Sequence, residues 1–258
     1  MKGSTDEMNQ GGYMARIPGI TVDQMREVDR LMVEEYGVTL LQMMENAGRG
    51  LAELTRRRLG GSAADRRIVV LAGKGNNGGG GLAAARHLHN WGALLQVVLA
   101  SPREEMTAVA SHQLDALDAA GVMIWGYGLD SGAEMVVRWD EAAVILDALL
   151  GYGLAGDPRG AYADLIRVAN ASRGPVISLD VPSGLDGTDG TIYSPTVDAT
   201  ATLTLALPKT GLIEGRPVVG DLYLADIGVP PALYSRMGLA VDSIFANDTI
   251  VPLGRYRV

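Results

Sequence analysis

The feature that most constrains this chain is a continuous apolar run that leads directly into a glycine-rich stretch. Residues 67–73 read RIVVLAG, and residues 73–81 then hold six glycines and two asparagines. A strand without polar alternation is typical of a parallel strand that helices cover on both faces. Glycines between such a strand and a helix let backbone amides approach a phosphate at the helix N-terminus. The stretch therefore indicates an α/β fold whose first strand-to-helix loop faces a ligand.

The same pairing of strand and helix repeats along the chain. Two helices are expected first, at about 21–36, where Thr21 or Asp23 provides the N-cap, and at about 40–59. Strands are expected at 67–73, 94–100, 122–126, 142–151, 174–180, 199–206 and 221–227, and further helices near 82–91, 104–120 and 160–171. This alternation predicts a doubly wound, mostly parallel sheet in a three-layer α/β/α fold with two N-terminal helices. The last two strands lack a long helix before them, which allows an antiparallel edge there.

Length and composition bound the class of protein. The chain has 258 residues, 47% of them hydrophobic and 20% charged, and it has no low-complexity linker, which indicates one globular domain. We expect residues 1–20 to be a flexible N-terminal segment and residues 21–258 to form a single domain. The absence of cysteine excludes a disulfide framework and thiolate chemistry. The net charge of −8 argues against a nucleic-acid partner, because phosphate binding needs clustered Lys and Arg.

The N-terminal sequence and the hydropathy bear on localisation. The first residues contain no apolar run of the signal-peptide type, and no stretch approaches the roughly 18 apolar residues that a membrane-spanning helix needs. A chain without cysteine also suits a reducing compartment. We therefore expect a cytoplasmic protein that does not bind membranes.

The glycine loop narrows the kind of ligand. Residues 73–78, GKGNNG, match the pattern G-x-G-x-x-G in the strand-to-helix context that binds a phosphate. A standard NAD dehydrogenase or a methyltransferase also needs an acid at the end of the second strand, and Ala100 and Ser101 stand there instead. A Walker A loop is excluded because no G-K-[ST] follows the asparagines.

The four consecutive glycines at 78–81 need an explanation of their own. Each costs about 0.5 to 1 kcal/mol relative to alanine in an ordered helix. They serve either the tight packing of a helix or the close approach of a ligand to the backbone. We favour the ligand, since Asn76 and Asn77 beside them offer amide donors and carbonyl oxygens that suit a nucleotide or a hard cation.

Polar side chains follow the predicted central strands, and in an open parallel sheet ligands gather at the carboxyl ends of the strands. Asp147 ends one strand and precedes a second glycine-rich loop at 151–157, and Asp180 ends the next and is followed by a turn with Ser183. Each aspartate alone is equally compatible with a helix cap or a turn. Two carboxylates, a hydroxyl and an amide at the same edge of the sheet favour a binding site. Lys209 either reaches this edge of the sheet or is a solvated surface lysine.

Six blocks of the sequence carry a resemblance to a known family. They are MREVDRLMVEEYGVTLLQMMENAGR (25–49), GKGNNGGGGLAAARHL (73–88), LDALLGYGL (146–154), LDVPSGLDGTDG (179–190), TLTLALPKTGL (202–212) and ADIGVP (225–230). In this order and spacing they resemble the NAD(P)HX epimerase family, the YjeF N-terminal domain. The ENAGR, GNNGG and DxPSG blocks are specific in combination. The resemblance covers about residues 20–232 and implies a Rossmann-like homodimer, in agreement with the predicted fold class.

The resemblance implies an activity on a damaged cofactor. The family interconverts the R and S forms of the hydrated cofactors NADHX and NADPHX, which a stereospecific partner dehydratase restores to NADH and NADPH. Carried over by motif, the substrate-binding residues are Asn76, Asn77, Gly78, Gly79, Gly80, Gly151, Tyr152, Gly153, Leu154, Ala155, Gly156, Asp157 and Asp180. The implied ligands of a potassium cofactor are Asn77, Asp147 and Ser183, which carry hard oxygen donors.

This sequence departs from the family pattern at one position. The family loop is GNNGGDG, and Gly80 replaces its aspartate. The missing carboxylate affects substrate orientation, potassium binding or catalysis, and it leaves open a catalytically impaired nucleotide-binding or scaffold protein of the same fold. The sequence also has no counterpart of the dehydratase domain to which this domain is fused in many bacteria, so it is either a stand-alone or an excised version.

The reaction implied by the resemblance needs a proton donor that becomes a base. The hydroxyl lies on ring carbon C6 next to the nitrogen, whose lone pair expels it as water and leaves an iminium that water attacks from either face. A partly buried carboxyl group suits both roles. We expect Asp180 to be this acid/base, because it ends a central strand beside a constrained turn, and Lys209 to be a nearby proton or charge partner.

Overall fold

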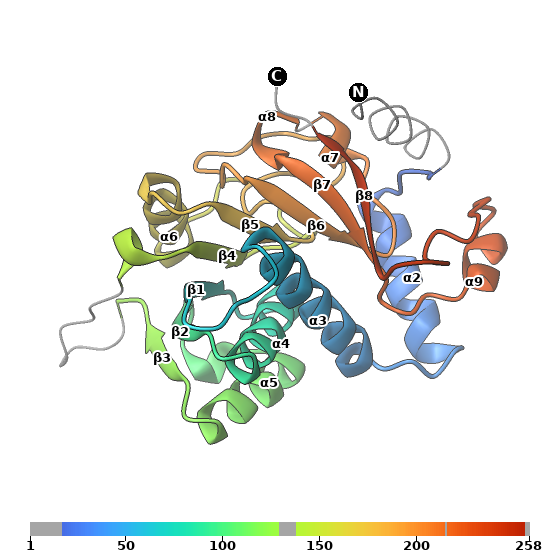
Figure 1. The fold of residues 1–258 in the computed structure, drawn as a ribbon. Coiled ribbons are helices and arrows are strands. Elements are labelled where there is room, and N and C mark those ends of the chain that lie inside the picture. The colour runs from blue at the N-terminus through green and yellow to red at the C-terminus, as the bar shows by residue number, and fades with distance from the viewer. Residues whose placement is uncertain (1–16, 129–137, 215, 256–258) are drawn as a thin grey trace, which may run out of the picture.

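The structure, a computed structural model, describes residues 17–128, 138–214 and 216–255. In these residues the strands form one sheet in the order β3-β2-β1-β4-β5-β6-β7-β8 (Figure 1). Every neighbouring pair is parallel except β7 and β8, which are antiparallel. The strands are β1 (Arg67–Ala72), β2 (Leu94–Leu99), β3 (Met123–Gly126), β4 (Val144–Ala148), β5 (Val176–Leu179), β6 (Ala201–Leu205), β7 (Asp221–Ala225) and β8 (Ile250–Arg255).

Helices cover both faces of this sheet, as predicted. The α-helices are α2 (Val22–Glu34), α3 (Leu40–Arg58), α4 (Asn76–Asn90), α5 (Ala108–Ala119), α6 (Ala161–Ala171), α7 (Gly211–Glu214), α8 (Arg216–Val219) and α9 (Pro231–Arg236). On β1, Ile68 and Val70 pack in one cluster with α3, α4 and α5, and Val69 and Leu71 pack in another with α6. Successive residues of a strand point to opposite faces, so a strand buried on both sides is apolar throughout. The three-layer α/β/α prediction is confirmed.

The two N-terminal helices begin where the sequence predicts. Thr21 is the N-cap of α2 and exchanges hydrogen bonds with Gln24: the Thr21 amide donates to Gln24 Oε1 at 2.9 Å, and the Gln24 amide donates to Thr21 Oγ1 at 3.2 Å. Thr39 and Gln42 form the same capping box at the start of α3. These reciprocal bonds satisfy amides that have no partner inside a helix.

The predicted N-terminal segment is described only in part. Residues 1–16 lie outside the described residues. Ile20 is fully buried, forms a parallel bridge with Lys209, and donates its amide to the Pro208 carbonyl at 2.8 Å. The packed domain therefore includes at least Ile20.

The glycines at 78–81 belong to a helix and do not form a loop. The helix predicted near 82–91 therefore begins earlier than expected. Helix α4 begins at Asn76, and all four glycines are buried in its first turns. A Cβ on Gly79 would lie 2.5 Å from the Met44 sulfur of α3, and one on Gly81 would lie 2.4 Å from the Ala148 Cβ of β4. Here the packing interpretation is the right one, because only glycine lets α4 approach its neighbours so closely.

The antiparallel edge lies at β8, a strand that the sequence reading missed. Strands β6 and β7 pair in parallel, although only the short helices α7 and α8 precede β7. β8 contains Pro252 and Gly254, two residues that weaken a strand pattern and are tolerated at a sheet edge.

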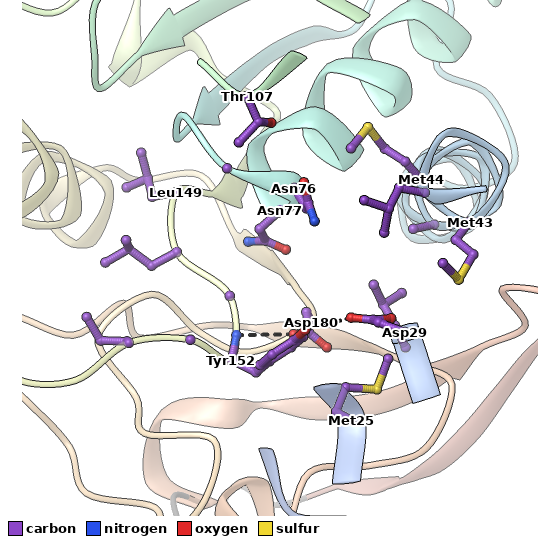
Figure 2. A pocket seen from close by; sticks show the side chains of 18 of the residues that line it. Met25, Asp29, Met43, Met44, Asn76, Asn77, Thr107, Leu149, Tyr152 and Asp180 are labelled. Atoms are coloured by element: carbon purple, nitrogen blue, oxygen red, sulfur yellow. Dashed lines mark hydrogen bonds between the residues drawn. The ribbon is translucent and has the colours of Figure 1, made fainter. Parts of the chain in front are cut away.

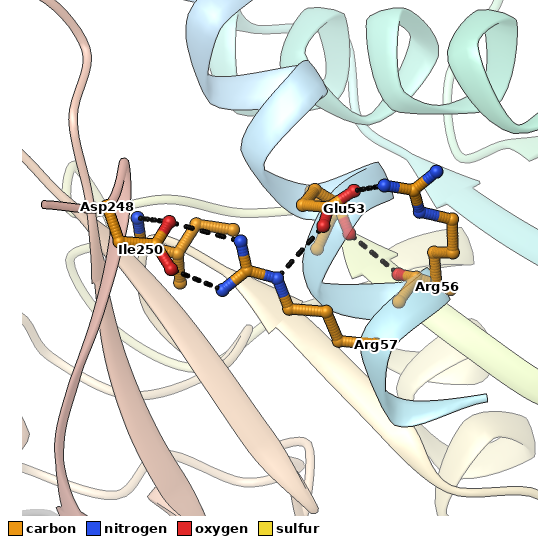
Figure 3. Close-up of polar contacts among 7 residues, drawn as sticks. Glu53, Arg56, Arg57, Asp248 and Ile250 are labelled. Atoms are coloured by element: carbon orange, nitrogen blue, oxygen red, sulfur yellow. Dashed lines mark hydrogen bonds and ion pairs between the residues drawn. The ribbon is translucent and has the colours of Figure 1, made fainter. Parts of the chain in front are cut away.

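An ion-pair network on the surface connects α3 to the chain just before β8. The Arg57 guanidinium donates to both oxygens of Asp248, at 2.9 and 3.0 Å, and Glu53 accepts from Arg57 and Arg56 (Figure 3). Exposed pairs of this kind contribute little to stability individually. No helix in the described ranges combines the length and apolar character needed to cross a membrane.

Candidate active site

A cavity of about 680 Å³ opens at the carboxyl ends of β1, β4 and β5, in the range typical of small-molecule sites (Figure 2). Its walls come from α2, α3, the start of α4, the loop after β4, and the segments that follow β5 and β6. Of the substrate-binding and catalytic residues predicted from the sequence, those that line it are Asn76, Asn77, Gly151, Tyr152, Gly153, Leu154, Ala155, Asp180 and Lys209.

Asp180 is held in a backbone conformation that few non-glycine residues adopt. Its φ angle is 67°, in the left-handed region, and its amide donates to the Leu203 carbonyl of β6 at 2.7 Å. Non-glycine residues in this region often mark functional sites, because the surrounding structure must compensate the strain. The residue is only 3% exposed, and its side chain points into the cavity.

Lys209 is buried and paired, which decides between the two interpretations left open by the sequence. Its side chain has no exposed area, and its Nζ donates to Asp180 Oδ1 at 2.5 Å and to the Leu205 carbonyl at 3.0 Å. A buried ion pair with further hydrogen bonds is far more constrained than a solvated lysine. The cavity therefore holds a fixed carboxylate–ammonium pair.

Tyr152 connects this pair to a second carboxyl group. Its backbone amide donates to Asp180 Oδ2 at 3.3 Å, and its hydroxyl donates to Asp29 Oδ2 at 2.6 Å. The Lys209 ammonium lies 5.8 Å from the centroid of its ring. Burial raises the pKa of Asp29, and the Tyr152 hydrogen bond and Lys209 oppose that shift only in part. Burial beside Asp29 also raises the pKa of Tyr152.

The sequence reading missed Asp29, although a signal was present. Asp29 follows Met25 by four residues and precedes Met32 by three, so it falls on the apolar face of α2. A carboxyl group inside an apolar stripe is unusual and marks a position of interest.

Of the three predicted potassium ligands, only Asn77 lines the cavity, and Asp147 and Ser183 are buried and do not line it. Asp147 is fully buried and accepts hydrogen bonds from the hydroxyls of Ser178 (2.8 Å) and Ser183 (2.6 Å) and from the amides of Ser183 (2.9 Å) and Leu149 (3.2 Å). Burial raises the pKa of Asp147, and these hydrogen bonds oppose the shift. The structure thus brings Asp147 and Ser183 into direct contact.

Asn77 is the third predicted ligand and lies against Gly151. A Cβ on Gly151 would be 3.3 Å from the Asn77 Cβ and 3.5 Å from Asp180 Oδ2. The Asn77 Nδ2 is buried without a hydrogen-bond partner in the described structure. No group of three or more His, Cys, Asp or Glu side chains in the described residues is arranged to hold a metal. Asn77, Asp147 and Ser183 carry amide, carboxylate and hydroxyl oxygens, the donor types that a hard cation takes.

Two groups of predicted substrate-binding residues lie away from this cavity. Gly78, Gly79 and Gly80 are buried inside α4 and do not line it, and a Cβ on Gly80 would lie 2.7 Å from Leu179 Cδ2. Residue 80 therefore packs between α4 and β5 and does not face the cavity. Gly156 and Asp157 line an adjoining cavity of about 490 Å³, which shares Leu150, Leu154, Ala155 and Tyr162 with the first.

The fold and the cavity together define a class of protein. Doubly wound α/β proteins bind their ligands outside the carboxyl ends of the strands, and here that place holds a glycine-rich strand-to-helix loop beside a buried Asp–Lys pair. Within that class, the chain belongs to the YjeF-related protein N-terminus family, which it matches over residues 40–211.

Individual relatives are similar to this chain over most of its length. It is 49% identical over 223 residues to an NAD(P)H-hydrate epimerase of Dehalogenimonas lykanthroporepellens, covering 86% of this chain and 87% of that one. It is 40% identical to a bifunctional NAD(P)H-hydrate repair enzyme of Salinibacter ruber, where the match covers 85% of this chain and 42% of the relative. Among solved structures, the yeast protein ynu0 superposes with a TM-score of 0.80 at 25% identity, over 92% of this chain and all of that one.

Proposed function

We propose that this chain is an NAD(P)H-hydrate epimerase, an isomerase that interconverts the R and S forms of NADHX and NADPHX. The observation that carries the proposal is the buried Asp180–Lys209 pair in the cavity beside the start of α4. The names and identities of its relatives support the same reaction.

The start of α4 suits the phosphates of a dinucleotide. Its N-cap is Gly75, which offers no side-chain hydrogen bond, so the first backbone amides of the helix are available to an anion. Asn76 and Asn77 add amide groups at the same end of the cavity. The hydrated ring then extends toward Asp180 and the loop at 151–155.

Asp180 performs the proton transfers in this proposal. In its protonated form, the Asp180 carboxyl group gives a proton to the hydroxyl on C6, the C–O bond breaks, and the ring nitrogen forms a C=N bond as water leaves. Water then adds to C6 from either face and returns a proton to the carboxylate, so no proton is gained or lost overall. Lys209 holds the carboxyl in place through its 2.5 Å contact.

An epimerisation assay tests the function directly. The parent protein is expected to equilibrate a purified single epimer of NADHX much faster than the spontaneous reaction, with chiral chromatography as the readout. A protein that binds the dinucleotide without accelerating epimerisation would instead be the impaired binding protein that Gly80 left open. Because the bifunctional relatives are named as repair enzymes, we also propose that the product passes to a stereospecific NAD(P)HX dehydratase.

Potassium is expected to stabilise the protein through Asn77, Asp147 and Ser183. Burial raises the pKa of Asp147 in the folded protein above its unfolded pKa of about 4. The contribution of this group to folding stability is therefore full below the unfolded pKa and is lost as the pH rises through the folded pKa. No ion pair of the described residues compensates the ionised carboxylate, and a bound cation would. At about 100 times its Kd, potassium should raise the melting temperature at neutral pH by about 5 to 10 °C.

The measurement is thermal unfolding in potassium chloride against choline chloride at equal ionic strength. Asp147→Ala should remove the response and weaken dinucleotide binding, whereas Asp164→Ala, on the exposed face of α6, should keep it. A parent whose melting temperature and dinucleotide affinity ignore potassium would refute this site.

We further propose a homodimer that uses the N-terminal helices. Of the apolar residues in that region, Met32 and Met44 are buried within the chain, whereas Val33 and Leu41 are 42% and 37% exposed. A two-fold interface is the commonest way to cover such a surface. Val33→Glu with Leu41→Glu should convert a dimer to a monomer in light scattering, and a monomeric parent at high micromolar concentration would disprove the proposal.

A further inference from the structure

Epimerisation at one carbon makes demands on both faces of the ring. The leaving hydroxyl needs a proton on one face, and the water that adds on the other face must lose one. A single carboxyl group can serve both oxygen positions only if the ring or the group moves between the two steps. Two carboxyl groups at different positions in the cavity remove that requirement, because one acts as the acid while the other acts as the base.

The cavity contains two such carboxyl groups. Asp29, from α2, and Asp180, after β5, both line it, and Tyr152 lies between them. The Tyr152 hydroxyl donates to Asp29 at 2.6 Å, and the Tyr152 backbone amide donates to Asp180 at 3.3 Å. The two carboxyl groups therefore lie at the two ends of one tyrosine, next to the same space (Figure 2).

The surroundings of the two groups differ in charge. Asp180 forms an ion pair with Lys209 and is in contact with a full positive charge. Asp29 has no ion pair among the described residues, and it accepts a hydrogen bond from the neutral Tyr152 hydroxyl. Burial, opposed in part by Tyr152 and Lys209, raises the pKa of Asp29, and the nearby Asp180 adds to the rise. Asp180 contacts a positive charge and Asp29 contacts a neutral hydroxyl, so the two carboxyl groups are held in different environments, as an acid and base pair requires.

We infer that Asp29 is a second acid/base group of the epimerisation, working with Asp180. This inference rests on the proposed function and adds to it. In one direction Asp29 protonates the hydroxyl on C6, the C–O bond breaks and the nitrogen lone pair forms the C=N bond. Water then forms a new C–O bond on the other face, the C=N electrons return to nitrogen, and Asp180 takes the excess proton. In the opposite direction the two groups exchange roles.

The test compares Asp29→Asn, Asp29→Ala and Tyr152→Phe in the epimerisation assay. Asp29→Asn should lower kcat by about 10²-fold or more with a small change in KM, because an amide cannot transfer the proton. Tyr152→Phe should lower kcat less than tenfold, since it removes one hydrogen bond and leaves the carboxyl group in place. Added formate should restore part of the activity of Asp29→Ala by supplying a carboxyl group in the vacated space.

Asp23→Asn is the matched control, because Asp23 lies on the same helix but is exposed and paired with Arg26. It should leave kcat unchanged, and the melting temperature of each variant reports whether it is folded. Two results would overturn the inference: full activity of Asp29→Asn, or equal losses in Asp29→Asn and Tyr152→Phe without rescue by formate, which would make Asp29 a positioning residue only. An inactive parent would instead refute the proposed function itself.

Discussion

Asp180→Asn should lower kcat for epimerisation by about 10² to 10⁴-fold while leaving dinucleotide binding largely intact. The amide keeps one oxygen that can still accept from the Lys209 ammonium, whereas the second oxygen, which accepts from the Tyr152 amide, is replaced by an NH2 group. What it loses is the ability to give and take a proton. The measurement is steady-state epimerisation of a single NADHX epimer, with binding of NADH followed separately by calorimetry.

Asp186→Asn provides a matched control for this experiment. Asp186 lies in the same segment after β5, where it accepts hydrogen bonds from the Thr188 amide and the Tyr193 hydroxyl, and it does not line the cavity. Its substitution should leave kcat near that of the parent. If Asp180→Asn instead keeps the parental kcat, the proton transfer belongs to another group, and Asp29 would be the next to examine.

Lys209→Met should lower the free energy of unfolding by about 3 to 5 kcal/mol. Lys209 has no exposed area and its partner Asp180 is almost as buried, so removing the ammonium leaves a carboxylate that is neither solvated nor paired. The methionine replaces the volume of the lysine stem, which isolates the effect of charge. Urea denaturation followed by circular dichroism gives the value.

A double-mutant cycle separates the ion pair from the packing. Combining Lys209→Met with Asp180→Asn should be less destabilising than Lys209→Met alone, because no uncompensated charge remains. Lys74→Met is the control: Lys74 pairs with Glu105 on the surface, and its loss should not measurably change stability. A Lys209→Met protein as stable as the parent would show that Asp180 does not depend on the ammonium.

The sequence alone predicts the fold class and the rim of the site. Unbroken apolar runs such as 67–73 identify parallel strands, because only a strand covered on both faces excludes polar residues so completely. Parallel strands end at one edge, so Asp147 and Asp180, each at the end of such a run, could be expected near each other without knowledge of the structure. A capping residue at Thr21 or Asp23 likewise marks where the first helix begins, and the structure shows that Thr21 is the cap.

Other properties depend on which surfaces meet, and only the tertiary structure decides that. The glycines at 78–81 suggest a ligand loop in the sequence, yet they are the surface through which α4 packs against α3, β4, β5 and the backbone of Gly73. Lys209 is ambiguous in sequence because its partner Asp180 is 29 residues away, and the hydrogen bond that brings Asp29 to Tyr152 spans 123 residues. Residue patterns indicate periodicity and burial within one helix or strand or between neighbouring elements. They do not record contacts between distant segments, and the charge and hydrogen bonding of this cavity depend on such contacts.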